Sequence, residues 1–136
     1  MAIVVRFGRP GAVRLSKCTI DESIGDFVYL FSSEVGYDIV RKANPLFINR
    51  VPAVGVVISK SSDEVCNVLW DGESPPIFFD LIPGKPYFLD YNGLPTRTPV
   101  APPGSSFLHV QALGIATATN KMYIKPHTQM TKRIFE

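Results

Sequence analysis

Twelve prolines and ten glycines divide this 136-residue chain into short apolar runs. Aromatic and β-branched residues are common within the runs, and Asn and Asp join Gly and Pro between them. This pattern is typical of strands joined by turns, because proline cannot donate to a sheet and β-branched residues favour extended backbone. The sequence therefore predicts an all-β fold, either a compact sandwich or a distorted barrel. The strands that we expect are Ile3–Phe7, Ala12–Thr19, Asp26–Phe31, Val51–Ser59, Glu64–Trp70, Ile77–Phe79, Pro86–Asp90, Phe107–Thr117 and Lys121–Lys125.

One segment, SSEVGYDIVRKA at residues 32–43, has some helix propensity. Two features argue against a helix there. Gly36 lies in its middle, where glycine lowers helix stability, and Asn44 precedes Pro45, which disfavours helical backbone at Asn44. We expect a short turn or strand in this segment.

Length and composition indicate one soluble domain. A chain of this size buries roughly two-thirds of its unfolded surface, which is enough for a single core. Hydrophobic residues make up 46% of the chain and charged residues 19%, which disfavours disorder. No apolar run approaches the roughly 18 residues of a membrane span. Only three apolar residues separate Ala2 from Arg6, which is too few for an export signal. We therefore expect that the chain is made in a cytoplasm and is not exported.

The net charge of +2 is unevenly distributed along the chain. Residues 1–20 carry a charge of +4, residues 21–120 carry −5 and residues 121–136 carry +3. Basic ends beside an acidic middle indicate two arms that contact acidic surfaces of partners. The predicted divisions are an amino-terminal basic arm or edge strand at 1–11, a single β domain at 12–126 and a carboxy-terminal arm at 127–136.

Basic and apolar side chains in the two arms are the candidate partner contacts. Ile134 and Phe135 follow two bases, and such apolar groups can anchor an interface while the bases pair with acids. The residues assigned to partner binding are Arg6, Arg9, Lys132, Arg133, Ile134 and Phe135.

The chain contains an internal repeat at an offset of 59 residues. Two copies of one strand–loop–strand unit, each unable to bury its apolar face alone, would account for it. Chance similarity within a β-rich chain is the alternative. The halves cover about 12–70 and 71–126. Identical residues recur at Gly25 and Gly84, Leu30 and Leu89, Val51 and Val110, Ala53 and Ala112, and Gly55 and Gly114.

Glycines of the repeat are expected to have structural roles. Gly25 and Gly84 begin the two units, and Gly55 and Gly114 interrupt apolar runs. Glycine within a strand marks a bulge or a close approach of backbone, although a merely tolerated glycine is the alternative. Two such positions at the same place in a repeat predict two equivalent corners.

A hairpin turn is predicted at Asn92-Gly93. An Asn-Gly pair between apolar residues is the commonest signal for a tight turn with positive φ, and it follows the predicted strand at 86–90. The loop from Leu94 to Ser106 contains four prolines, so we expect it to be stiff and exposed.

The sequence lacks the common motifs of catalysis and metal binding. Cys18 and Cys66 are too few for a tetrahedral zinc site, and His109 and His127 lie far from them in sequence. We expect buried free thiols, with a disulfide as the alternative, and no cofactor or metal.

Weak acid–base candidates exist, but each has a simpler explanation. Asp63-Glu64 lies in a polar loop, Asp71 and Glu73 follow a strand as a turn, and His109, near Ser105-Ser106, fits an outward position of an alternating strand. Most of the aromatic residues of the central region are expected to be core. Its net acidic charge disfavours nucleic-acid binding. The sequence therefore favours a binding protein over an enzyme.

Residues 81–126 resemble a β module of tailed-bacteriophage virion proteins, notably capsid decoration and head-fibre proteins. In that family a PG-x-x-Y-x-L strand precedes a Gly-Leu turn, a Thr/Pro loop, a V-Q-x-x-G-x-A strand and a last strand that ends in proline. The upstream half extends the resemblance to about residues 12–126. The matching residues are, in order, Pro83-Gly84, Tyr87, Leu89, Gly93-Leu94, Thr96–Pro99, Val110-Gln111, Gly114, Ala116 and Ile124–Pro126.

The resemblance implies a virion structural protein without enzymatic activity, a cement protein that binds and bridges capsid subunits. It would be made in the host bacterial cytoplasm and lie on the capsid exterior. The implied partners are the major capsid protein and copies of this chain, grouped as trimers, with no membrane and no nucleic acid. The alternative is a tail or fibre module that binds a host-surface glycan or another tail protein. The family pattern includes no catalytic position and neither basic arm.

Overall fold

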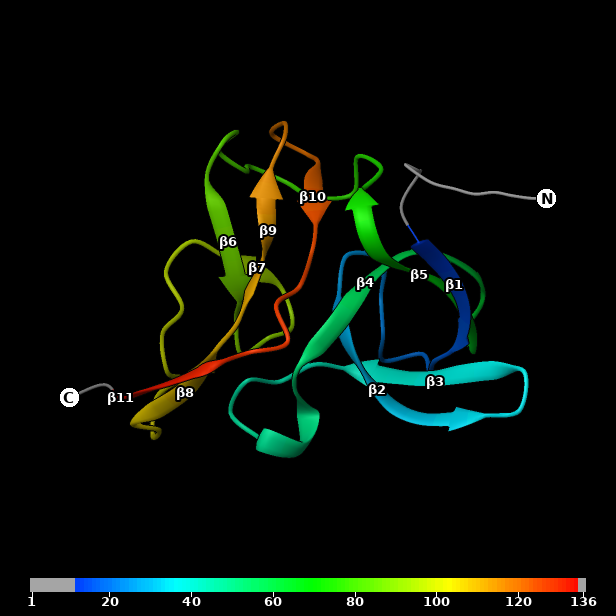
Figure 1. Ribbon diagram of the computed structural model, residues 1–136, viewed down its shortest axis with the longest axis horizontal. Coiled ribbons are helices and arrows are strands. Elements are labelled where there is room, and N and C mark those ends of the chain that lie inside the picture. The colour runs from blue at the N-terminus through cyan, green and yellow to red at the C-terminus, as the bar shows by residue number, and fades with distance from the viewer. Residues whose placement is uncertain (1–11, 135–136) are drawn as a thin grey trace.

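The structure, a computed structural model that describes residues 12–134, is built from β-strands (Figure 1). The described residues contain no α-helix, and a 3-10 turn at Ile48–Arg50 is their one helical element. This confirms the predicted all-β class. The strands are β1 (Ala12–Lys17), β2 (Phe27–Glu34), β3 (Tyr37–Lys42), β4 (Ala53–Ser62), β5 (Val65–Glu73), β6 (Pro86–Leu89), β7 (Pro95–Thr96), β8 (Phe107–Val110), β9 (Ala112–Ala116), β10 (Met122–Ile124) and β11 (Thr131–Ile134).

Strands β1 to β5 form a closed barrel. Their order is β1-β3-β2-β4-β5, and β5 closes the ring by pairing with β1. The β1–β3 pair is parallel, and the other pairs of the barrel are antiparallel. Residues 32–43 contribute the β2–β3 hairpin, and Gly36 adopts a φ of +91° in its turn. The expectation of a turn or strand rather than a helix is therefore confirmed in this segment.

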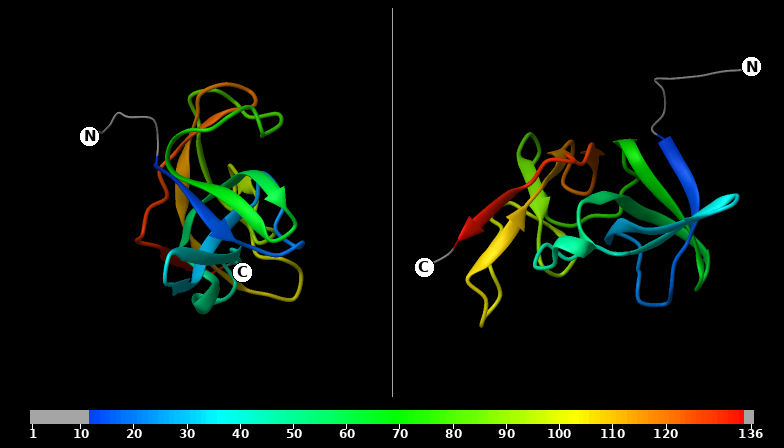
Figure 2. Two further views of the ribbon diagram at one scale, coloured as in Figure 1. Left: turned by 90° about the vertical axis from the view of Figure 1, so that its right-hand side faces the viewer. Right: turned by 60° about the horizontal axis from the view of Figure 1, so that its bottom comes forward.

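The second half of the chain forms an open sheet beside the barrel. Its strand order is β10-β9-β6-β7, and β10 links it to the barrel by pairing with the end of β5. Strands β8 and β11 form a separate two-stranded ribbon. Figures 1 and 2 show β1 and β11, the first and last described strands, toward opposite ends of the molecule.

The two halves share one strand register, so the predicted repeat is also present in the structure. In each half the pairing shifts by one residue at the same place, which is where a bulge lies. Every paired position in the second half is displaced by 59 residues from its counterpart. The pairs are Phe27↔Val56, Val28↔Gly55 and Tyr29↔Ala53 in the first half, and Pro86↔Ile115, Tyr87↔Gly114 and Phe88↔Ala112 in the second.

The turns that lead into β2 and β6 also match. The Gly25 N–H donates to the Val57 carbonyl at 2.8 Å, and the Gly84 N–H donates to the Ala116 carbonyl at 2.8 Å. The φ angles of these glycines are +96° and +84°, in the left-handed region that residues with a Cβ rarely adopt. Both turns therefore require glycine.

The apolar interior consists of two clusters. The barrel cluster fills the inside of the barrel, and the central cluster combines residues of the barrel with residues of the second half. Phe27 and Val56 belong to the central cluster, whereas their neighbours Val28 and Val57 belong to the barrel cluster. The start of β2 and the middle of β4 are therefore buried on both faces. The barrel cluster contains Cys18, Val28, Val40, Val57, Cys66 and Val68.

A buried glutamine connects the two halves. Gln111 is fully buried, and its side-chain amide pairs with both the N–H and the carbonyl of Ala53 at 2.8 Å. The same amide donates to the His127 carbonyl at 2.8 Å. The side chain thus hydrogen-bonds to the start of β4 as the backbone of a neighbouring strand would. The N–H and carbonyl of Ala53 and the carbonyl of His127 all gain a partner in this way.

The structure corrects two of the predicted strands. Residues 77–79 are not a strand, because they follow Pro75-Pro76, which lack amide donors, and because Phe78 packs into the core with its ring 6.1 Å from that of Phe27. The run 107–117 is divided into β8 and β9 at Gln111, whose side chain turns inward. Within the proline-rich loop, the short strand β7 pairs with β6. The predicted strand at 3–7 lies outside the described residues.

Candidate interaction surfaces

The carboxy-terminal segment, predicted as an arm, folds back on its own chain as β11. It forms an antiparallel ribbon with β8, and the Lys132 ammonium lies 4.5 Å from the centre of the Phe107 ring. All four residues of β11 are exposed, and Ile134 retains 69% exposure. Lys132, Arg133 and Ile134 are therefore presented together on one exposed strand.

The remaining predicted contacts, Arg6, Arg9 and Phe135, lie outside the described residues. The described chain begins at Ala12, which pairs with Asp71 on β5.

Gly55 and Gly114 allow two strands to approach closely. A Cβ at Gly55 would collide with the Leu69 carbonyl oxygen, and a Cβ at Gly114 would collide with the Tyr123 carbonyl oxygen. Leu69 and Tyr123 hold equivalent positions, because each pairs with the residue that follows the glycine. The predicted close backbone approach is confirmed in both halves.

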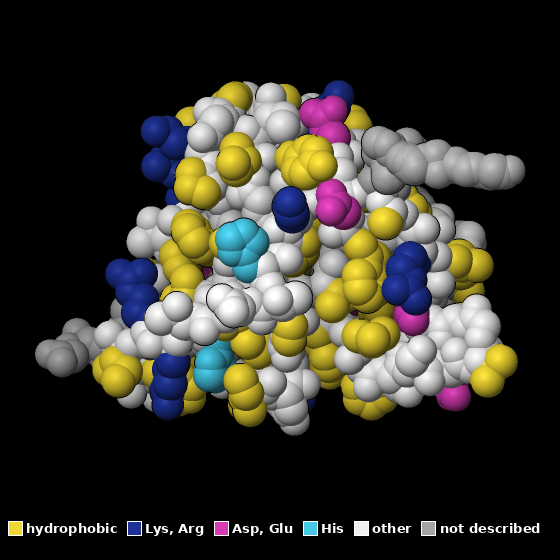
Figure 3. All heavy atoms as spheres, in the orientation of Figure 1, with side chains coloured by type: hydrophobic (Ala, Val, Ile, Leu, Met, Phe, Trp, Pro, Cys, Tyr) yellow, Lys and Arg dark blue, Asp and Glu magenta, His cyan; other side chains and the backbone are white. Residues whose placement is uncertain are grey.

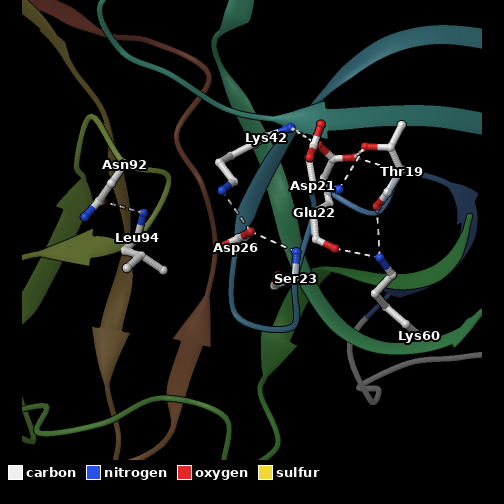
Figure 4. A network of polar contacts seen from close by, with 9 residues as sticks. All are labelled: Thr19, Asp21, Glu22, Ser23, Asp26, Lys42, Lys60, Asn92 and Leu94. Carbon is white, nitrogen blue, oxygen red and sulfur yellow. Dashed lines mark hydrogen bonds and ion pairs between the residues drawn. The ribbon is translucent and has the colours of Figure 1, made fainter. Parts of the chain in front are cut away.

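The predicted turn at Asn92-Gly93 joins β6 to β7 and docks on the barrel. Gly93 adopts a φ of +81°, and its N–H donates to the Asp90 carbonyl at 3.0 Å. The Asn92 side-chain oxygen accepts from the Leu94 N–H at 3.1 Å (Figure 4). The Gly93 carbonyl accepts from the Phe27 N–H at 2.8 Å, so the turn also holds the second half against β2.

A cluster of polar groups fixes the loop between β1 and β2 (Figure 4). Glu22, which is 3% exposed, accepts from the Thr19 amide at 2.7 Å, the Thr19 hydroxyl at 2.8 Å and the Lys42 amide at 3.2 Å. The Lys60 ammonium donates to the carbonyls of Thr19 and Glu22 at 2.9 and 2.6 Å. Asp26 forms an ion pair with Lys42 at 3.4 Å. These groups satisfy one another, so the cluster has a structural role.

Cys18 and Cys66 are free thiols inside the barrel, which confirms the predicted buried thiols and excludes the disulfide in this structure. Burial, together with the neighbouring Cys18, raises the pKa of the Cys66 thiol to about 12. Because the thiolate is the reactive form of cysteine, a thiol that stays protonated suits packing rather than chemistry.

The acid–base candidates do not converge on one site. Asp63-Glu64 lies in the β4–β5 turn, Asp71 and Glu73 lie on β5, and His109 lies on β8. Residues 12–134 contain no group of three or more His, Cys, Asp or Glu side chains arranged to hold a metal ion. Asp71 and Glu73 accept hydrogen bonds from Tyr123 and Thr117, two residues that line the groove described next.

An apolar groove of about 510 Å³ lies on the outward face of the second half. Pro86, Ala112, Ile115 and Tyr123 form its apolar part, and Lys125 is among its polar lining residues. Figure 3 shows hydrophobic side chains on the upper middle of this face, with acidic side chains to their right and a basic side chain and a histidine below. The groove thus combines an apolar floor with charges of both signs.

The groove lies on the face of the second half that corresponds to a buried face of the first half. Pro86 and Ile115 are the counterparts of Phe27 and Val56, which have no exposed surface, whereas Ile115 is 50% exposed. This groove was not predicted from the sequence. Its signal was present in the repeat, because a unit with two apolar faces appears twice, but only the three-dimensional arrangement shows which face lacks a cover.

Comparisons with known proteins found no relative of this chain. The chain matches no protein-family model, no curated protein and no solved structure. Among the described residues, no helix has the length and apolar character needed to cross a membrane.

Proposed function

We propose that this chain is a virion structural protein without enzymatic activity, a decoration protein that binds the exterior of a bacteriophage capsid and bridges its subunits. The resemblance of residues 81–126 to decoration and head-fibre modules supports the proposal. Its partners are the major capsid protein and further copies of this chain, and it reaches the virion after synthesis in the host bacterial cytoplasm.

The observation that carries the proposal is the exposed basic strand β11. Lys132, Arg133 and Ile134 stand on a strand whose four residues all face solvent, and the strand is fixed by pairing with β8. Bases beside an apolar side chain form a contact that attracts an acidic surface and then excludes water from part of it. A strand held in place loses less conformational entropy on binding than a free tail would.

The shape of the molecule also suits a bridging role. A cement protein must contact two neighbouring subunits at once, and β1 and β11 lie toward opposite ends of this molecule (Figure 1). The Gln111 side chain and the Gly93 carbonyl bond the two halves together, so a contact at one end is rigidly connected to a contact at the other.

The test is co-sedimentation of the purified chain with undecorated phage heads. Deleting residues 127–136 would also remove the backbone partners of Gln111 and Ala112, so charge reversal is the sharper change. The variant Lys132→Glu/Arg133→Glu should lose saturable binding. The matched control Lys85→Glu/Arg97→Glu reverses two exposed charges elsewhere and should bind as the unaltered chain does.

Failure of the unaltered chain to bind heads would contradict the proposal. Glycan-array binding by the same preparation would then favour the tail or fibre class, whose contacts would include exposed aromatic side chains such as Tyr91, which is 38% exposed. The Phe107 ring is less suited to stacking on a sugar, because Lys132 already lies over it.

A further inference from the structure

The strand edges in residues 12–134 differ in how they are protected. The barrel closes on itself, because β1 pairs with both β3 and β5, so it presents no edge. The open sheet of the second half ends at β7, whose two residues include Pro95, which cannot donate a backbone hydrogen bond. The β8–β11 ribbon lies at one end of the molecule (Figure 1) and ends at β11, which contains no proline and has four exposed residues. Strand β11 is therefore the described edge best suited to accept a further strand.

The free edge of β11 presents the backbone groups of Lys132 and Ile134. The His109 N–H donates to the Pro45 carbonyl at 2.9 Å and is therefore not directed at β11. Two residues that face each other in an antiparallel pair direct their backbone groups either toward each other or away from each other. His109 faces Lys132, so the N–H and carbonyl of Lys132 point away from β8. The same holds for Ile134, because the pattern alternates along the strand.

The side chains of β11 give this edge a chemical preference. Lys132 and Ile134 lie on one face of the ribbon and Arg133 on the other, because side chains alternate along a strand. A strand added at the edge would place one side chain directly opposite Lys132 and another opposite Ile134. An acid opposite the lysine and an apolar group opposite the isoleucine are the favourable cross-strand pairs. The segment that fits therefore carries an acidic residue two positions from an apolar one.

A second copy of this chain fits the edge less well than an acidic strand does. When β11 pairs antiparallel with itself, Lys132 stands opposite Lys132 or opposite Ile134, because these are the residues of β11 that direct their backbone groups outward. The first register opposes two lysines, and the second opposes Arg133 to Arg133. Like charges directly opposite one another destabilise a strand pair, and natural edge strands carry bases for this reason. The same bases favour an acidic partner.

We infer that the free edge of β11 binds an extended acidic segment of a partner protein by strand addition, which extends the β8–β11 ribbon to three strands. The inference deepens the proposed function and rests on it only for the identity of the partner as a capsid subunit. It assigns part of the contact to the backbone groups of Lys132 and Ile134, and not to side chains alone.

Amide hydrogen exchange of the full chain in the presence of a synthetic peptide tests the inference directly. The probe is the acetylated and amidated octapeptide TVEEVEVT, in which acidic residues lie two positions from valines. Binding should slow exchange of the Lys132 and Ile134 amides by at least about tenfold. The amides of Thr131 and Arg133 already face β8 and should be unchanged. Side-chain contact without strand pairing would not give this alternation.

Two control peptides separate backbone pairing from charge. N-methylation of the fourth and fifth residues of the probe removes two donors and keeps every side chain and charge. Replacement of each glutamate by lysine keeps the backbone and reverses the charge. Neither peptide should protect the two amides, because strand addition needs the donors and the edge selects acids.

A proline variant extends the test to phage heads. Ile134→Pro removes an outward N–H but no hydrogen bond to β8, which is the kind of position where an edge strand tolerates proline. It should bind undecorated heads at least about tenfold more weakly than the matched control Ile134→Ala, which keeps the N–H. Slow exchange of the Arg133 amide in both variants shows that the ribbon is intact.

The outcomes distinguish this inference from the proposed function. Head binding lost in Lys132→Glu/Arg133→Glu but equal in Ile134→Pro and Ile134→Ala would support the capsid contact and overturn strand addition. Failure of the unaltered chain to bind heads, together with amide protection by the probe, would contradict the capsid proposal and support strand addition. Protection of the two amides that grows with the concentration of the chain alone would identify a second copy as the occupant and overturn the inference.

Discussion

In the first half of this molecule, β2 and β4 have an apolar cluster on each face, whereas in the second half β6 and β9 have one on a single face. The strand pairs have the same register and the same bulge, displaced by 59 residues. The difference arises in what covers each face. In the first half, the barrel cluster covers the face of Val28 and the central cluster covers the face of Val56. In the second half, the face of Tyr87 packs into the central cluster and the face of Ile115 is half exposed.

The comparison shows that a repeated unit can specify strand pairing without specifying burial. Val28 and its counterpart Tyr87 are both buried, but Val56 is buried and its counterpart Ile115 is half exposed. What covers each face depends on how the two copies pack on one another, and not on the strand register that they share. An uncovered apolar face at a repeated position is therefore a reason to look for a partner.

Substitution of the two glycines that allow strands to approach closely should have the largest effect on the free energy of unfolding. Gly55→Val and Gly114→Val should each lower the free energy of unfolding by about 3 kcal/mol or more, because a carbonyl oxygen cannot move aside without breaking a strand pair. Urea denaturation measures both. Gly36→Asn, at an open turn with positive φ, is the control and should cost less than about 1 kcal/mol. If either valine is tolerated, the two corners are not equivalent.

Loss of the Gln111 hydrogen bonds between the two halves should have the next largest effect on the free energy of unfolding. Gln111→Leu removes the partners of the Ala53 N–H and carbonyl, and it should cost about 3 kcal/mol in denaturant unfolding because buried polar groups are left unpaired. The exposed Gln129→Leu is the matched control and should cost little. A similar cost for both variants would show that Gln111 does not connect the halves.

Truncation of counterpart residues measures the difference in burial itself. Val56→Ala should cost about 2 kcal/mol, because it opens a cavity in the central cluster. Ile115→Ala removes more atoms but should cost at most about 0.5 kcal/mol in the dilute chain, because its side chain already faces water. Equal costs would mean that both faces are covered.

The smallest expected effect concerns the thiol in the barrel. The pKa of Cys66 is raised from 9.0 to about 12, so the protonated thiol stabilises the fold below pH 9 and this stabilisation is lost as the pH rises from 9 toward 12. Stability should fall by about 1 kcal/mol more between pH 8 and pH 10 than it does in Cys66→Ala. Identical pH dependence in the two chains would place the thiol in contact with water.

The sequence predicts the features that depend on local chemistry. The all-β class follows from the spacing of Pro and Gly, and Gly55 and Gly114 mark close approaches because few other features explain glycine in an apolar run. The turn at Asn92-Gly93 was predictable because an Asn-Gly pair between apolar residues is a strong local signal for a tight turn.

Features that depend on distant partners were not predictable. β11 forms because β8, about twenty residues earlier, offers a free edge, and nothing in the local pattern of residues 127–136 indicates this. Residues 77–79 resemble a strand in composition but serve as a packed loop. The exposure of Ile115 depends on the absence of a strand that would cover it, which no local pattern encodes. The roles of Arg6, Arg9 and Phe135 stay predictions.

The central claim is that the second half exposes the face that the first half buries. Methyl NMR with a soluble paramagnetic relaxation agent, at a concentration where the chain is monomeric, tests it most directly. The account predicts strong relaxation of the Ile115 methyl groups and little relaxation of those of Val56, with Val57 as a buried reference. Equal protection of Ile115 and Val56 in the monomer would contradict it.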